Sequence, residues 1–163
     1  MTVRVQGAKE SAQVQYPLEE AIRDISSASF ADDVASQKEA VRQFLGKHHS
    51  PLSEHADYIV DVSQTYGIDY RIIPAIAMQE SNLCKKAPAD SYNCWGYGIY
   101  GGKVTKFSNY KEGIERVAFT LSQSYIKQGY STIEQIMSKY TPRNTNNWVL
   151  GVTHFMSQIE ENL

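Results

Sequence analysis

The sequence predicts an α+β domain that is mainly α-helical and carries one small β-hairpin lobe. Apolar side chains recur every three or four residues on both sides of the middle of the chain, which is typical of amphipathic helices. Between Asn82 and Phe107 this spacing is lost, and glycines and aromatic residues replace it. We therefore expect helices, then a short hairpin, then further helices, with a ligand-binding cleft between the two lobes.

Before the aromatic segment, caps and breakers mark the predicted helices. One apolar face runs from Val34 to Leu45 and is followed by Gly46, a typical C-terminal stop. A second helix is predicted from Pro51, capped by Ser50 and ended by Gly67. A third begins near Asp69 and is apolar from Ile72 to Met78, so we expect it to run through the core. Pro74, near its start, predicts a kink or a tight first turn.

After that helix the pattern indicates a turn and three more helices. Gly101 and Gly102 lie between two short aromatic or β-branched runs and predict a two-residue hairpin turn. Asn109 with Glu112 forms a capping-box pattern, Gly129 marks the end of that helix, and Ser131 with Glu134 repeats the pattern. The last helix carries an apolar stripe from Trp148 to Ile159, and residues 140–147 are predicted as a loop.

Size and charge limit the class of protein. The 163 residues suit one domain, with residues 1–30 expected as an extension or linker and residues 31–163 as the folded domain. Sixteen Lys and Arg residues against eighteen Asp and Glu residues give a net charge of −2, so we expect no nucleic acid partner and no anionic membrane partner. No apolar run reaches the ~18 residues that a membrane span needs, and no signal-peptide pattern opens the chain. We expect a soluble monomer without a cofactor.

The two cysteines, Cys84 and Cys94, lie ten residues apart in a loop-like segment. Their even number favours a short disulfide, and the alternative is two free thiols in a reducing compartment. A zinc site is disfavoured because neither cysteine has a neighbouring His or a second Cys pair, and the adjacent His48 and His49 lie at a helix junction without a carboxylate cluster. We expect no metal, and the disulfide favours an extracytoplasmic location.

Glu80 departs most clearly from the apolar pattern. It follows Ile73, Ile76 and Ala77 at spacings of seven, four and three residues, so it projects from the same face as these apolar side chains. Burial raises the pKa of a carboxyl group, and a general acid needs a raised pKa to hold its proton near neutral pH. Glu80 is therefore a candidate proton donor. The alternative is that it marks a frayed helix end and points to water.

The chain from Gly67 to Asn82, with its Glu80–Ser81 pair, resembles the catalytic helix of lytic transglycosylases and of bacterial glucosaminidase domains. The run from Ser91 to Ile99 is similar to the Tyr-Asn-x-Phe-Gly-Ile segment of the glucosaminidase family, with Cys94 and Trp95 in place of the usual apolar pair. Phe107 and Tyr110 resemble that family's aromatic entry into its next helix, and Tyr140 stands in the place of its late Tyr. These features follow the family's order over residues 51–160 and imply a lysozyme-like fold.

The resemblance implies cleavage of peptidoglycan glycan strands, at the β-1,4 bond between N-acetylglucosamine and N-acetylmuramic acid. Glu80 would protonate the glycosidic oxygen, and Tyr140 would position a reacting group or stabilise developing charge. Aromatic rings stack on sugar faces, Asn side chains match an N-acetyl group, and glycines permit close approach. The predicted substrate-binding residues are Ser81, Tyr92, Asn93, Trp95, Gly96, Tyr97, Gly98 and Tyr110.

A second carboxylate, which most glycosidases use, is not evident from the sequence. Asp90 lies in a turn-forming loop and Glu112 has a capping role. The substrate itself then supplies the nucleophile, as in lytic transglycosylases, where a muramyl hydroxyl closes a 1,6-anhydro ring; hydrolysis by an endo-N-acetylglucosaminidase is the other outcome. Two other classes stay open, a catalytically silent lysozyme-like module that binds glycan or protein, and a helical interaction domain.

Overall fold

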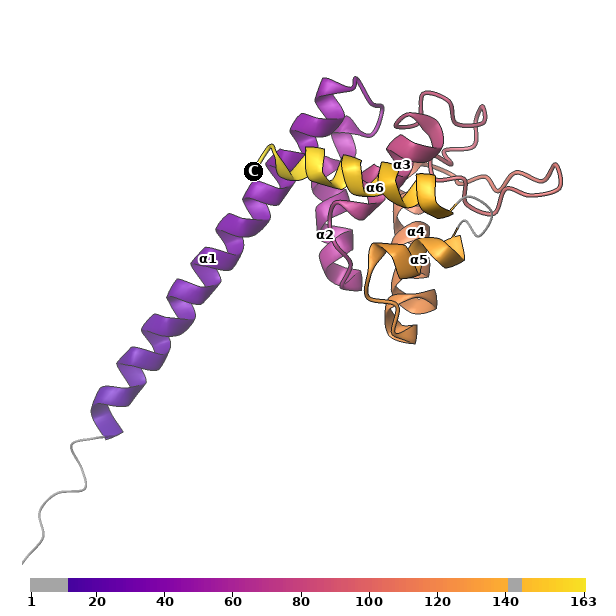
Figure 1. Ribbon diagram of the computed structural model, residues 1–163. Helices are drawn as coiled ribbons and strands as arrows, with labels where there is room; N and C mark the ends of the chain where they lie inside the picture. The colour runs from indigo at the N-terminus through magenta and orange to yellow at the C-terminus, as the bar shows by residue number, and fades with distance from the viewer. Residues whose placement is uncertain (1–11, 141–144) are drawn as a thin grey trace, which may run out of the picture. The chain divides into compact units, whose positions relative to one another are not determined.

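The computed structural model describes residues 12–140 and 145–163, and in this part of the chain the extended elements are all helices, joined by loops (Figure 1). The expectation of a mainly helical protein is confirmed. The elements are α1 (Ala12–Lys47), η1 (Ser53–His55), α2 (Ala56–Tyr66), α3 (Ile72–Ser81), α4 (Tyr110–Ser124), η2 (Ile126–Gln128), α5 (Ile133–Tyr140) and α6 (Thr145–Glu160), where η denotes a 3-10 helix.

The chain divides into two compact units, one ending at Ala35 and one running from Ser36 to Leu163. In the first unit the structure describes the residues from Ala12 onward, and α1 runs from there without a break past residue 30. The second unit contains the last turns of α1 and every other element. The role of residues 1–30 as an extension stays a prediction.

The core of the second unit is built around α3. Its residues from Ile72 to Met78 are all buried, because α3 packs against α2, α4 and α6. Pro74 is the third residue of the helix, where its missing amide donor costs no hydrogen bond because first-turn amides have no partner within the helix. Of the two predicted outcomes for Pro74, the tight first turn is therefore the one that the structure supports.

The predicted β-hairpin lobe is the main correction to the fold class. Gly101 and Gly102 both adopt positive φ values, as a two-residue turn requires, and Tyr100 pairs with Lys103 in an antiparallel bridge. The pairing stops there, and no strand forms in the part of the chain that the structure describes. The physical reason is that Thr105 uses its hydroxyl on the carbonyl of Gly98, at 3.1 Å, so that side-chain bonds replace the ladder that would extend the hairpin.

The predicted caps are confirmed in part. Gly67 ends α2 in a left-handed conformation, as predicted, but α2 begins at Ala56, after η1, and not at Pro51 with Ser50 as its cap. Asn109 accepts the amide of Glu112 at 2.9 Å and starts α4, as predicted. At α5 the capping pair is Thr132 with Gln135 rather than Ser131 with Glu134. The Thr132 hydroxyl accepts the amide of Gln135 at 3.2 Å, and the Gln135 side-chain oxygen accepts the amide of Thr132 at 3.2 Å. The predicted loop over residues 140–147 is shorter than expected. Tyr140 ends α5, Thr145 begins α6, and residues 141–144 lie outside the described residues.

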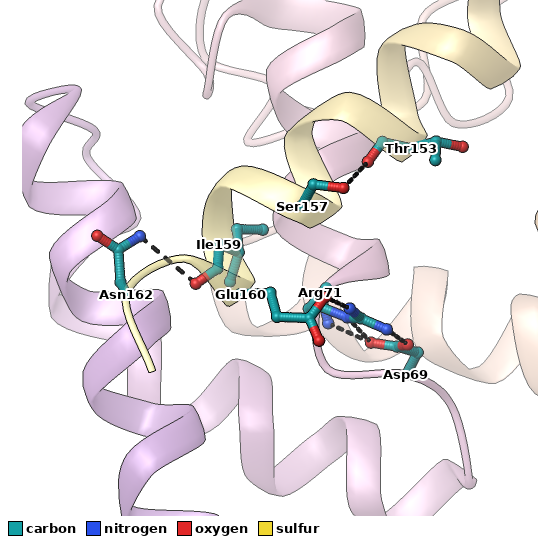
Figure 2. Close-up of polar contacts among 7 residues, drawn as sticks. All are labelled: Asp69, Arg71, Thr153, Ser157, Ile159, Glu160 and Asn162. Carbon is teal, nitrogen blue, oxygen red and sulfur yellow. Dashed lines mark hydrogen bonds and ion pairs between the residues drawn. The ribbon is translucent and has the colours of Figure 1, made fainter.

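Helices α3 and α6 run antiparallel, and polar contacts join them at both ends. At one end Arg71, just before α3, forms ion pairs with Asp69 at 2.6 Å and with Glu160, the last residue of α6, at 2.5 Å (Figure 2). At the other end Trp148, in the first turns of α6, donates a hydrogen bond to Glu80 in the last turn of α3. This antiparallel packing places the candidate acid next to the start of α6.

Candidate active site

Glu80 lies one residue before the end of α3, where the buried helix reaches the surface. The side chain is exposed, as the alternative interpretation of the sequence anticipated, but its carboxyl end is enclosed on two sides. One carboxylate oxygen accepts the indole N–H of Trp148, and the other faces the backbone of Gly96. Partial burial raises the pKa of the Glu80 carboxyl above its ordinary value, and the Trp148 hydrogen bond opposes that shift.

Trp148 is a site residue that sequence reasoning missed. The sequence assigned it only to the apolar stripe of the last helix, and the structure confirms that it is buried, 5% exposed. A buried indole N–H requires a hydrogen-bond acceptor. This requirement is the one feature of the sequence that points to a polar partner for Trp148. Which acceptor it meets depends on how α6 packs against α3.

Gly96 brings the backbone of the loop against Glu80. It has φ +64°, a conformation that side chains disfavour, and a Cβ at this position would lie 2.9 Å from a carboxylate oxygen of Glu80. The predicted role of Gly96 was close backbone approach to the substrate. The structure shows close approach to the candidate catalytic carboxyl.

The loop that carries Gly96 is tied to α3 by several bonds. Cys84 and Cys94 form the predicted disulfide, which is confirmed. Ser81 donates its hydroxyl to the carbonyl of Cys94 at 2.7 Å and accepts the amide of Cys84 at 2.9 Å. Trp95 is fully buried and donates its indole N–H to the carbonyl of Ile73 at 3.1 Å. Ser81 and Trp95 therefore hold the loop on the helix, and the ring of Trp95 has no face available to a sugar.

Asn93 organises the same loop internally. Its amide nitrogen donates to the carbonyls of Tyr97 and Thr105, at 2.8 and 2.9 Å, while its side-chain oxygen accepts the amide of Tyr97 at 3.0 Å. Asn93 is 1% exposed, and both amide hydrogens are used within the protein. These bonds correspond to the turn-forming role of Asn93 rather than to recognition of an N-acetyl group.

Tyr140 reaches the same cluster from the end of α5. Its hydroxyl donates to the carbonyl of Trp95 at 2.7 Å, and its ring centroid lies 5.5 Å from that of Trp148. Burial raises the pKa of the Tyr140 hydroxyl far above its ordinary value, and the nearby Glu80 carboxylate adds to the shift. The hydroxyl is thus a permanent donor that holds the residue next to Gly96 in place.

A cleft with a volume of about 350 Å³ opens beside Glu80. Three of the predicted substrate-binding residues, Ser81, Asn93 and Gly96, contribute to its wall, and Lys86 contributes a cation that the sequence did not single out. The other predicted residues lie elsewhere. Tyr92 and Tyr110 pack edge to face with ring centroids 5.0 Å apart, Tyr97 lines a different cavity, and Gly98 (φ +59°) faces Thr105.

The two candidates for a second carboxylate do not line this cleft. Glu112 accepts the amide of Ser108 at 2.6 Å, and this backbone hydrogen bond lowers the pKa of its carboxyl. Asp90 is exposed in a turn with φ +52°. Glu80 is the one carboxylate among the residues that form the cleft wall.

Among residues 12–140 and 145–163, no group of three or more His, Cys, Asp or Glu side chains is arranged to hold a metal ion. Within the same residues, no helix is both long and apolar enough to cross a membrane.

No protein-family model matches the chain, and no curated protein matches it either.

Proposed function

We propose that this protein is a lysozyme-like enzyme that cleaves peptidoglycan glycan strands, with Glu80 as the general acid. One observation carries the proposal: a carboxyl group with a raised pKa stands at the wall of a cleft, between the indole N–H of Trp148 and the backbone of Gly96. A raised pKa keeps the proton on the acid until it is transferred to the leaving glycosidic oxygen.

A single-carboxylate mechanism fits the composition of the cleft. Two-carboxylate glycosidases place their carboxyl groups about 5 to 9.5 Å apart across the bond, whereas the residues around this cleft include Glu80 alone. The nucleophile is then a hydroxyl of the substrate or a water molecule. After giving up its proton, Glu80 is a carboxylate that removes a proton from that nucleophile. The enzyme would act as a lytic transglycosylase or as an endo-N-acetylglucosaminidase.

Trp148 and Tyr140 act as positioning residues in this scheme. The indole N–H of Trp148 stabilises the carboxylate form that Glu80 adopts after proton transfer. The Tyr140 hydroxyl anchors the carbonyl of Trp95, next to Gly96, so it holds the wall against which Glu80 rests. The Cys84–Cys94 disulfide is in keeping with an extracytoplasmic location, where this substrate occurs.

The first prediction tests the acid itself. Glu80→Gln keeps the shape and the hydrogen-bond acceptor for Trp148 but has no proton to give, so cleavage of purified peptidoglycan should fall below detection. Release of soluble fragments and their masses provide the measurement, with 1,6-anhydro ends indicating a transglycosylase and reducing N-acetylglucosamine ends a glucosaminidase. Glu54→Gln, an exposed change of the same type in η1, is the matched control. Cleavage by the Glu80→Gln protein at the control rate would refute the mechanism.

A further inference from the structure

A second and larger cavity lies on the face formed by α2 and α4. Its volume is about 800 Å³, and its wall shares no residue with the cleft at Glu80. We name it the α2–α4 groove and define it by Tyr58, Tyr66, Glu115 and Phe119, with Tyr97 at its edge. Tyr97 directly follows Gly96, so the two cavities lie along the same loop.

A carboxylate is held in place inside the α2–α4 groove. Glu115 accepts hydrogen bonds from the hydroxyls of Tyr58, at 2.7 Å, and Tyr66, at 3.1 Å. The bond to Glu115 favours the protonated hydroxyl and raises the pKa of Tyr58 to about 12. A carboxylate offers about four acceptor sites, which leaves roughly two for hydroxyl or amide donors of a ligand.

An aromatic surface lies beside this carboxylate. Phe119 is 49% exposed, and its ring meets that of Tyr66 edge to face with centroids 6.1 Å apart. The Tyr97 hydroxyl contacts Thr120 at 3.2 Å, which fixes a third ring at the edge of the groove. An exposed Phe has no hydrogen-bonding role of its own, so its contribution to a ligand is an apolar face.

The charges around the groove balance. Lys111 and Arg116 stand against Glu112 and Glu115, and the ammonium of Lys111 lies 5.1 Å from the centre of the Tyr58 ring. A groove wall with equal numbers of positive and negative side chains favours neither a polyanion nor a polycation. It suits a neutral ligand that alternates apolar faces with hydroxyl and amide groups, and a pyranose chain has this character.

We propose that the α2–α4 groove is a second carbohydrate-binding site, which holds a short segment of a neutral amino-sugar chain away from the Glu80 cleft. Phe119 supplies the stacking face, and Glu115 accepts hydrogen bonds from sugar hydroxyl or acetamido groups. The choice of an amino sugar rests on the proposed function, whereas the carbohydrate character of the site rests on the groove alone.

The test uses the full chain with Glu80→Gln, so that binding is measured without cleavage, and the probe is the β-1,4-linked tetramer of N-acetylglucosamine. Calorimetric titration should show that adding Phe119→Ala weakens binding about tenfold, the loss expected when a central aromatic contact is truncated. Glu115→Gln, which keeps the shape but not the charge, should also weaken binding. Phe30→Ala is the matched control, since Phe30 is 63% exposed and belongs to the other unit.

Several outcomes separate this inference from the proposed function. If the tetramer binds the Phe119→Ala and Phe30→Ala proteins equally, or binds none of the proteins, the groove is not a carbohydrate site, whether or not Glu80 supports cleavage. If Phe119→Ala weakens binding while the wild-type protein fails to cleave peptidoglycan, the groove binds sugar and the proposed function is wrong. Equal melting temperatures for the variants verify that binding was not lost through unfolding.

Discussion

At the residue scale, two effects act in opposite directions on the Glu80 carboxyl. Burial disfavours its charged form and raises the pKa, whereas the indole N–H of Trp148 favours the charged form and lowers it. Burial is the larger effect, so the group stays protonated to a higher pH than an ordinary Glu. Activity that depends on the protonated acid should therefore decline as pH rises through this raised pKa.

The second prediction follows from that balance. Trp148→Phe keeps an aromatic ring but removes the donor, so the pKa of Glu80 should rise further, and the decline in activity should move to higher pH. The rate at low pH should also fall, by about tenfold or more, because one donor to the developing carboxylate is lost. Measured pH profiles of peptidoglycan cleavage test this. A fall in rate with an unchanged profile would show that Trp148 acts only through packing.

The third prediction concerns Gly96. Gly96→Ala places a methyl group 2.9 Å from the Glu80 carboxylate and also costs about 1 to 2 kcal/mol for a left-handed backbone. Gly101→Ala is the matched control, since Gly101 has φ +56° and nothing within 4 Å of the added Cβ. Thermal unfolding should show similar destabilisation in both variants, whereas cleavage should be lost in Gly96→Ala alone. Equal activity in the two would mean that Gly96 does not position Glu80.

At the element scale, the loop between α3 and α4 depends on the end of α3 for its position. Asn82, Leu83 and Cys84 follow the helix with φ values of 51°, 53° and 73°, a run of left-handed residues that reverses the chain. The disulfide and the Ser81 hydroxyl then bring the later part of the loop back against the helix. The helix that carries the acid and the loop that encloses it are thus one connected structure.

The fourth prediction tests this connection. Cys84→Ala with Cys94→Ala opens a ring of ten-residue separation and should lower the free energy of unfolding by about 2 to 3 kcal/mol on the loop-entropy model. Denaturant unfolding measures this, and reductant should destabilise the wild-type protein but not the double variant. Thiol titration of the unfolded, unreduced wild-type protein should find no free thiol. Two free thiols would contradict the disulfide.

At the scale of the whole molecule, the second unit contains both cavities and a core that begins within α1. Ala40, Val41, Phe44 and Leu45 are at most 2% exposed, so the last turns of α1 belong to that core. Lys38 pairs with Asp61 at 2.6 Å, and Arg42 pairs with Asp57 at 2.6 Å. Both contacts lie within the unit that starts at Ser36.

The fifth prediction follows from this boundary. A chain of residues 36–163 should keep the melting temperature of the second unit and the cleavage activity, because the core and the Glu80 site are complete. The matched control, residues 46–163, lacks the buried Phe44 and Leu45, each worth about 2 to 5 kcal/mol, and should unfold because a domain has only about 5 to 15 kcal/mol in total. Circular dichroism melting distinguishes them. Loss of folding in 36–163 would place essential contacts before residue 36.

Much of the local structure was predictable because helix caps, helix stops and tight turns depend on interactions between residues that are close in the sequence. The stop at Gly67, the cap at Asn109 and the turn at Gly101 and Gly102 each depend on backbone conformations or hydrogen bonds that neighbouring residues decide. The disulfide was predictable for the same reason, since a separation of ten residues keeps two cysteines close. The hairpin strands were not, because strand pairing competes with side-chain bonds such as that of Thr105 to Gly98.

Periodicity and residue chemistry predicted most of the helices, favoured the disulfide and, together with the family resemblance, singled out Glu80 as the candidate acid. They did not predict that α1 begins as early as Ala12 or that α2 begins only at Ala56. The groups that surround Glu80 depend on tertiary packing instead. Trp148 donates a hydrogen bond to Glu80, which is 68 positions away in the sequence, and Tyr140 donates one to the carbonyl of Trp95, which is 45 positions away. A buried indole N–H or hydroxyl must find an acceptor, but several lie within reach of any such group. Which one it finds depends on how α6 packs against α3 and α5 packs against α6, and helical spacing carries no information about that packing.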